Sequence, residues 1–203
     1  MARVAVEASV PSAEAALSAS LDFLQEYELP LTVVYDDSLI ELDWRTAQAI
    51  LLRTYAYLNK LNISRGGSWD TSDVLLRSMC GEAAFAGKER LRQALSAQAS
   101  DEQTQVNDKP RTYDHVALGG TFDHLHAGHK ILLTMAACIT SERLVVGVTD
   151  DSMLSKKQHK ELVQSLDERI DAVQSFITLT KPGIRPHVVP IQVMSPLRGF
   201  LLS

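Results

Sequence analysis

The fold of this chain is decided by the stretch HVALGGTFDHLHAGH, which runs from His115 to His129. Its opening residues, 115–118, form an apolar-rich run of the kind that a buried strand shows. The pair Gly119–Gly120 then ends the strand and lets the backbone approach a ligand closely. A helical pattern begins near Gly128, so the stretch predicts a strand, a glycine turn and the N-terminus of a helix.

Strand and helix patterns alternate in the residues that follow this stretch. The expected elements are a helix at Gly128–Ile139, a strand at Leu144–Thr149, a helix from Leu166 to about Thr180 and a strand at His187–Ile191. Such alternation predicts right-handed βαβ units, and therefore an α/β fold with a Rossmann-like, doubly wound parallel sheet. Ligands bind such sheets beyond the carboxyl ends of the strands, where the first strand delivers residues 119–129.

Residues 1–95 have a different pattern, which predicts an α-rich N-terminal region of unknown role. Apolar spacing indicates three helices and one short strand, at Pro11–Tyr27, at Trp44–Leu61, from Val74 to about Ala97, and at Leu31–Tyr35 for the strand. Residues 96–111 are polar and lack aromatic side chains, as linkers do. The expected organisation is therefore the N-terminal region 1–95, a linker 96–111 and a second domain at 112–203.

Charge and composition argue against several classes of partner. The net charge of −5 gives no general attraction for nucleic acid or for an anionic membrane, so phosphate binding needs a local site. No apolar run approaches the roughly 20 residues that span a bilayer, and early acidic residues argue against a targeting peptide. Cys80 and Cys138 lie far apart without metal-ligand spacing, which indicates reduced, buried thiols in a cytoplasmic protein.

The glycine turn and the helix start bring together groups that bind phosphate. His126 and His129 are three residues apart, so they share one face of a helix, and Gly128 leaves room beside them. The helix N-terminus adds free N–H groups and the positive end of its dipole. Thr121 offers a hydroxyl, with a role in the turn alone as the lesser alternative, and Asp123 can equally hydrogen-bond its own turn. The stretch predicts an anion site for a polyphosphate.

The run Gly-Gly-Thr-Phe-Asp-x-x-His-x-Gly-His at 119–129 resembles the signature of the HxGH nucleotidyltransferase superfamily. In that pattern these residues surround the α- and β-phosphates of a nucleoside triphosphate. The residues downstream, at 144–151, 154–157 and 166–169, resemble those of the eukaryotic and archaeal phosphopantetheine adenylyltransferases, including the adenylyltransferase domain of CoA synthase. The resemblance covers about residues 113–192. A GxGxxG pattern is absent, so a dinucleotide site is not expected.

The resemblance implies the transfer of AMP from ATP to 4′-phosphopantetheine, which gives dephospho-CoA and pyrophosphate, with Mg²⁺ accompanying the nucleotide. It implies that His129 stabilises the transferring phosphate, that Thr121 positions the attacking phosphate, and that Lys156 or Lys157 neutralises charge on both. Without the resemblance, the two lysines read as a solvated pair. The implied nucleotide-binding residues are Gly119, Gly120, Thr121, Phe122, Asp123, His126, Gly128, His129 and Arg169, the last of which also fits an exposed helix position.

The chain departs from the family after its third expected strand. The family's second phosphate motif, Ile-Ser-Ser-Thr/Ser-x-x-Arg, is absent, and residues 192–203 do not continue into the Asp-Pro-Tyr-Gly-like loop of relatives. We therefore expect residues 112–203 to be the N-terminal half of a truncated nucleotidyltransferase domain. Two alternatives remain open, namely a cytidylyltransferase that acts on a phosphorylated alcohol, which shares the core motif, and an inactive nucleotide-binding fragment.

Overall fold

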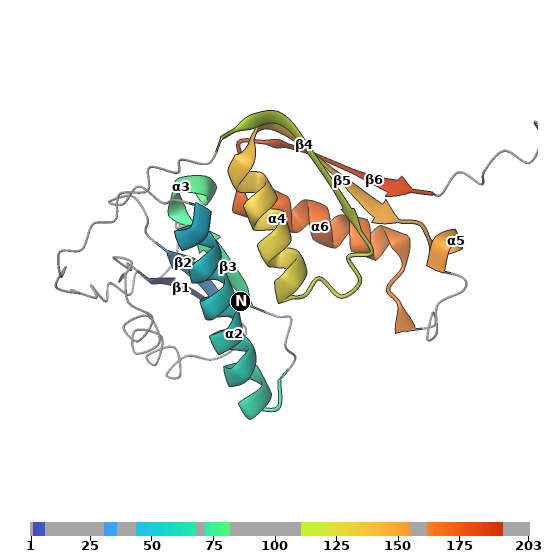
Figure 1. The fold of residues 1–203 in the computed structure, drawn as a ribbon. Helices are drawn as coiled ribbons and strands as arrows, with labels where there is room; N and C mark the ends of the chain where they lie inside the picture. Colours follow the sequence, from blue (N-terminus) through green and yellow to red (C-terminus); the bar gives the residue numbers. More distant parts are fainter. Residues whose placement is uncertain are drawn as a thin grey trace, which may run out of the picture.

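The computed structural model describes residues 2–6, 31–35, 44–67, 72–81, 111–154 and 162–192. The described strands form two three-stranded parallel sheets, with the orders β1-β2-β3 and β4-β5-β6 (Figure 1). The elements of the first unit are β1 (Ala2–Val6), β2 (Leu31–Tyr35), α2 (Trp44–Ser64), β3 (Asp73–Leu76) and α3 (Arg77–Cys80). The elements of the second unit are β4 (Tyr113–Gly120), α4 (Ala127–Ile139), β5 (Thr140–Thr149), α5 (Asp151–Leu154), α6 (Leu166–Thr180) and β6 (Arg185–Ile191).

The second unit confirms the predicted α/β architecture. Strand β5 lies between β4 and β6, and all three run parallel. Leu144, Val146 and Val148 alternate along β5 and are fully buried, because helices α4 and α6 pack against that face of the sheet (Figure 1). Among the described residues, both crossover helices cover this same face.

The bounds of these elements lie close to those expected from the sequence. Helix α6 has the predicted ends, and α4 begins one residue before the predicted start. Strand β5 begins four residues earlier than predicted, at Thr140, because α4 passes directly into it. The hydroxyl of Thr140 donates to the Ala136 carbonyl at 2.7 Å. This hydrogen bond satisfies one of the last backbone acceptors of the helix.

The N-terminal region contains a parallel sheet, of which the sequence analysis predicted only the strand at Leu31–Tyr35. The predicted helix from Val74 to Ala97 is wrong at its start, where β3 pairs with β2 and only the short α3 follows before Gly81. Residues 74–76 are an unbroken apolar run, buried on both faces of the sheet, and such a run does not distinguish strand from helix by its period. The remainder of that helix, the helix at Pro11–Tyr27 and residues 96–110 lie outside the described residues.

Helix α2 confirms the helix predicted at Trp44–Leu61 and extends it to Ser64. Its buried stripe packs on β2 and β3 and consists of Ala47, Ile50, Leu51, Tyr55 and Leu58. Two buried hydrogen bonds join the helix to the sheet. Tyr35 and Thr54 share a side-chain bond of 2.7 Å, and the Val74 amide donates to the Tyr55 hydroxyl at 3.0 Å.

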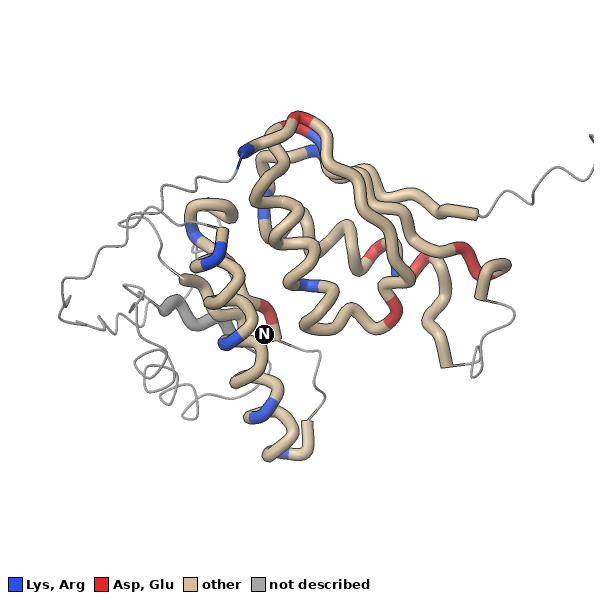
Figure 2. Tube along the Cα trace, viewed as in Figure 1, with Lys and Arg blue, Asp and Glu red and all other residues tan. Residues whose placement is uncertain are grey.

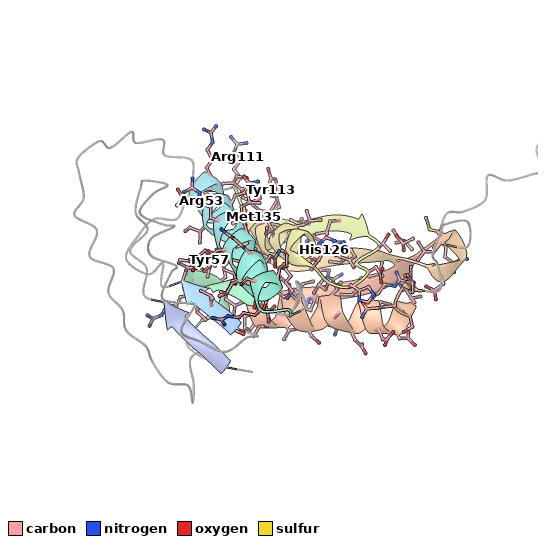
Figure 3. All side chains as sticks on the ribbon, turned by 90° about the horizontal axis from the view of Figure 1, so that it is seen from below. Arg53, Tyr57, Arg111, Tyr113, His126 and Met135 are labelled. Carbon is pink, nitrogen blue, oxygen red and sulfur yellow. The ribbon has the colours of Figure 1, made fainter. Side chains whose placement is uncertain are left out.

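The two units meet along helix α4. Met135 of α4 belongs to the core cluster of the N-terminal unit, and Figure 3 shows it on the helix that neighbours α2, which carries Tyr57. The buried ammonium of Lys130 lies 2.8 Å from the Asp73 carboxylate and donates to the Ser72 carbonyl at 2.8 Å. One face of α4 therefore packs on its own sheet while another face packs on the N-terminal unit.

Charged residues of both signs are interspersed along the described chain (Figure 2). Within the described ranges, no helix combines the length and the apolar character that crossing a membrane requires. Neither Cys80 nor Cys138 forms a disulfide; Cys80 is buried, as predicted, whereas Cys138 is half-buried.

Candidate active site

The predicted phosphate-binding stretch lies where strand β4 ends and helix α4 begins. Gly119 and Gly120 pair with Gly147 and Val148 at the carboxyl ends of β4 and β5. Residues 121–126 form the connecting loop, and the N-terminus of α4 opens at this same edge of the sheet (Figure 1). The location is the one expected for ligands of parallel sheets.

The loop is held in an uncommon backbone conformation. Phe122 and His124 have φ values of 52° and 41°, in the left-handed region that residues with side chains seldom adopt. The Phe122 ring is fully buried beneath the loop. A Cβ placed on Gly120 would lie 3.1 Å from that ring. The second glycine of the pair thus makes room for Phe122, a role additional to the close ligand approach that the sequence predicted.

His126 and His129 form a stacked pair at the start of α4 (Figure 3 labels His126). Their ring centroids are 3.7 Å apart, with 22° between the planes, and the Phe122 ring lies 5.1 Å from that of His129. His126 caps the helix, since its Nδ1 accepts the His129 amide at 3.4 Å. A Cβ on Gly128 would approach Cε1 of His126 to 3.1 Å. Gly128 therefore leaves the space that the His126 ring needs.

Burial and the neighbouring His126 lower the pKa of His129 to about 4, while the Asp123 carboxylate acts in the opposite direction. The imidazole is consequently uncharged at neutral pH and carries one N–H. Among the described residues, its Nδ1 is a buried atom without a hydrogen-bond partner. An unpartnered buried nitrogen is costly in a folded chain.

The loop is fastened from the far side by Gln164, which the sequence analysis did not single out. Its side-chain Oε1 accepts a hydrogen bond from the His124 backbone amide at 2.7 Å, and its own backbone amide donates to Oδ1 of Asp123 at 2.9 Å. The Asp123 carboxylate thus shapes the loop, although through Gln164 and not through its own turn. Gln164 immediately precedes Ser165, whose hydroxyl caps α6 in a capping box with Glu168. That Ser-x-x-Glu pattern is the sequence signal that could have marked this position.

Arg169 lies directly beneath the loop and is completely buried. Its Nη1 donates to the carbonyls of Thr121 at 2.9 Å and Thr149 at 2.8 Å, and its Nε donates to the Gln164 carbonyl at 2.9 Å. Its Nη2 pairs with the Asp151 carboxylate at 2.5 Å. The guanidinium is therefore occupied within the protein, whereas the resemblance implied contact with the nucleotide. Lys156 and Lys157 lie outside the described residues.

This geometry falls within residues 117–189, which match the model of the Cytidylyltransferase-like family. We call residues 117–189 the cytidylyltransferase-like segment, after the family model that they match. The match begins within β4 and ends within β6, so the cytidylyltransferase-like segment contains the loop, the histidine pair, Gln164 and Arg169. The described residues 2–81 of the N-terminal unit lie outside it.

Curated relatives match over the same segment. The chain is 50% identical over 76 residues to the phosphopantetheine adenylyltransferase of Saccharomyces cerevisiae, which is 37% of this chain and 25% of that protein. It is 39% identical over 77 residues to the phosphopantetheine adenylyltransferase of Methanopyrus kandleri, 38% of this chain and 48% of that protein. The chain thus spans between a quarter and a half of the length of these relatives. No solved structure gives a significant match.

Proposed function

We propose that this chain transfers AMP from ATP to 4′-phosphopantetheine, giving dephospho-CoA and pyrophosphate. The observation that carries the proposal is the stacked His126–His129 pair at the α4 N-terminus, within a segment that is 50% identical to a phosphopantetheine adenylyltransferase. The neutral, half-buried His129 and the free N–H groups of the helix start suit a site for phosphate oxygens.

The proposed reaction needs no covalent intermediate and no general base. An anionic phosphate oxygen of 4′-phosphopantetheine forms a bond to the α-phosphorus of ATP, and the bond from that phosphorus to the bridging oxygen of pyrophosphate breaks. Pyrophosphate leaves with the electron pair of the broken bond. The work of the protein is to align the two anions and to stabilise the charge that collects on the α-phosphate.

In this proposal each residue of the loop has a separate role. His129 donates its N–H to an oxygen of the transferring phosphate, and the anion beside it favours the protonated ring, which opposes the burial that keeps it neutral. The Thr121 hydroxyl positions the attacking phosphate at the carboxyl end of β4. We assign charge neutralisation to Lys156 or Lys157 on the strength of the family resemblance alone.

We propose that Mg²⁺ arrives with ATP, held by the oxygens of its phosphates. Within the described residues, no group of three or more His, Cys, Asp or Glu side chains is placed to hold a metal ion. Cys80 and Cys138 form no disulfide, which suits the cytoplasmic location that we propose.

Pyrophosphate release from the full chain tests the proposal. ATP with 4′-phosphopantetheine is compared with CTP and either phosphocholine or glycerol phosphate, and His129→Ala is the matched inactive variant. We expect turnover with the first pair only, lost in His129→Ala while the thermal midpoint stays close to that of the parent. The family description favours the second candidate, a cytidylyltransferase, and turnover with CTP alone would establish it. Calorimetric binding of ATP without any turnover would establish a nucleotide-binding role instead.

A further inference from the structure

The loop between β4 and α4 does not hold its conformation by itself. Two of its residues, Phe122 and His124, have positive φ values, and neither is a glycine. A backbone of this kind persists only where the surrounding structure fixes it, and it concentrates at functional sites. Residues outside the loop therefore fix its conformation.

The first of these residues is Gln164. Its side-chain Oε1 accepts a hydrogen bond from the backbone amide of His124, one of the two strained residues, at 2.7 Å. Its backbone amide donates to the Asp123 side chain at 2.9 Å. One residue thereby engages two successive positions of the loop, from 40 and 41 residues further along the chain. The His124 ring reaches the same segment, since its Nε2 lies 3.3 Å from the Leu162 carbonyl.

The second is Arg169, which fixes the entry to the loop. Its Nη1 bridges the Thr121 carbonyl and the Thr149 carbonyl, and so joins the residues that follow β4 and end β5. The Thr149 hydroxyl also donates to the Gly120 carbonyl at 3.1 Å, one residue before the loop. A planar guanidinium with five donors suits this arrangement, and a lysine ammonium would not reproduce it.

Both residues are held by the start of helix α6. The Ser165 hydroxyl accepts the Glu168 amide at 3.3 Å, and the Glu168 carboxylate accepts the Ser165 amide at 2.9 Å. Gln164 directly precedes this capping box, and Arg169 follows it. Its Nε also donates back to the Gln164 carbonyl at 2.9 Å. The capped N-terminus of α6 therefore fixes the loop through Gln164 and Arg169.

We propose that Gln164 and Arg169 are positioning residues. They hold loop 121–124 in the backbone conformation that places Thr121 and His129 beside the phosphates of the bound substrates. The proposal rests on the proposed function for its effect on turnover. Arg169 then contributes to the site through the two strand ends that it joins, from a position beneath the nucleotide. The class of ligand whose binding depends on the pair is a nucleoside triphosphate.

The test compares three glutamine variants of the full chain. Gln164→Ala removes the oxygen that accepts the His124 amide, whereas Gln164→Glu keeps an acceptor there. Gln174→Ala is the control, since Gln174 is exposed on helix α6. The readouts are amide hydrogen exchange at His124, the ATP dissociation constant from calorimetry, and kcat and KM. We expect about tenfold faster exchange and about tenfold weaker ATP binding in Gln164→Ala, as loss of one such bond predicts, with recovery in Gln164→Glu.

Arg169 is tested through its partner, because Arg169→Lys removes buried bonds and can prevent folding. Asp151→Asn leaves Arg169 in place and removes the carboxylate that orients its Nη2. Asp151 is largely exposed, so we expect the chain to fold while ATP binding weakens severalfold.

Hydrogen exchange separates failure of this proposal from failure of the proposed function. A parent chain without turnover refutes the adenylyltransferase proposal, while faster exchange at His124 in Gln164→Ala still supports positioning. Unchanged His124 exchange in Gln164→Ala overturns the positioning role. A lower thermal midpoint with unchanged ATP affinity, kcat and KM also overturns it, since it shows that Gln164 contributes only to stability.

Discussion

Replacing Asp73 by asparagine is expected to destabilise the chain by about 3 kcal/mol, because it removes the carboxylate that pairs with the buried ammonium of Lys130. The two side chains belong to different units, Asp73 to β3 and Lys130 to the first turn of α4. They are 15% and 7% exposed, and Nζ lies 2.8 Å from Oδ1. The pair is therefore a buried bridge between the two sheets and not a surface ion pair.

The magnitude follows from this geometry. At 2.8 Å and an effective dielectric constant of about 20, the Coulomb attraction is about 6 kcal/mol, which the loss of hydration of both groups largely offsets. Loss of one partner of a buried pair costs about 3–5 kcal/mol. The ammonium keeps the Ser72 carbonyl at 2.8 Å and the Phe176 ring at 5.9 Å, so the lower end of that range applies.

Urea unfolding of the full chain measures the effect, with Trp44 on α2 as the fluorescence probe. Asp114→Asn is the matched control, since Asp114 is exposed and bonds only the Ser141 hydroxyl among described side chains; we expect a change within about 0.5 kcal/mol there. The double variant Asp73→Leu with Lys130→Met replaces the pair by apolar groups and should recover most of the loss. An Asp73→Asn effect no larger than that of the control would refute a buried bridge between the units.

Three further predictions concern the site and its supporting helix. Gly128→Ala places a Cβ 3.1 Å from Cε1 of His126, so ATP affinity should fall severalfold in calorimetry, while the helix-favouring alanine holds or raises the unfolding free energy by up to about 1 kcal/mol; unchanged affinity would contradict it. Burial and then His126 lower the His129 pKa to about 4, so His126→Asn should raise that pKa in an NMR titration. Because the unfolded imidazole takes up its proton first, the parent chain should lose stability as the pH falls from about 6.5 towards 4; a parent imidazole that titrates at its ordinary pKa would disprove both statements. Ser165→Ala removes the helix cap and should cost about 1 kcal/mol in urea, and a loss equal to that of Ser175→Ala, an exposed serine on α6, would exclude the capping role.

The sequence predicted those elements in which local pattern and tertiary surroundings agree. Helix α6 has the predicted ends because its apolar spacing and its capping box indicate the same segment. Strand β3 was missed because residues 74–76 are apolar without interruption, and only their surroundings identify a strand. Val74 and Leu76 pack with α2, whereas Leu75 packs with Cys80 on the other side. That two-sided burial is a property of the assembled sheet and not of the four residues.

The candidate site divides in the same way. His126 and His129 could be predicted as neighbours because three positions along a helix bring side chains to one face. Gln164 and Arg169 could not be assigned their partners in the loop, since these are backbone groups 40 or more residues away, the His124 amide and the Thr121 carbonyl. Every residue has such an amide and carbonyl, so the sequence does not mark which ones a distant side chain will bond.

Lys130 connects the N-terminal unit with the helix that carries the two histidines of the site. It follows His129 directly in the sequence. Successive positions on an α-helix point about 100° apart, because one turn takes 3.6 residues. His129 accordingly stacks on His126, while Lys130 is directed to Asp73 in the other unit. Residues 72–76 therefore support the helix that carries the histidines, although they lie outside the cytidylyltransferase-like segment. A shift of the N-terminal sheet would move α4, and with it the imidazole on which the proposed chemistry depends.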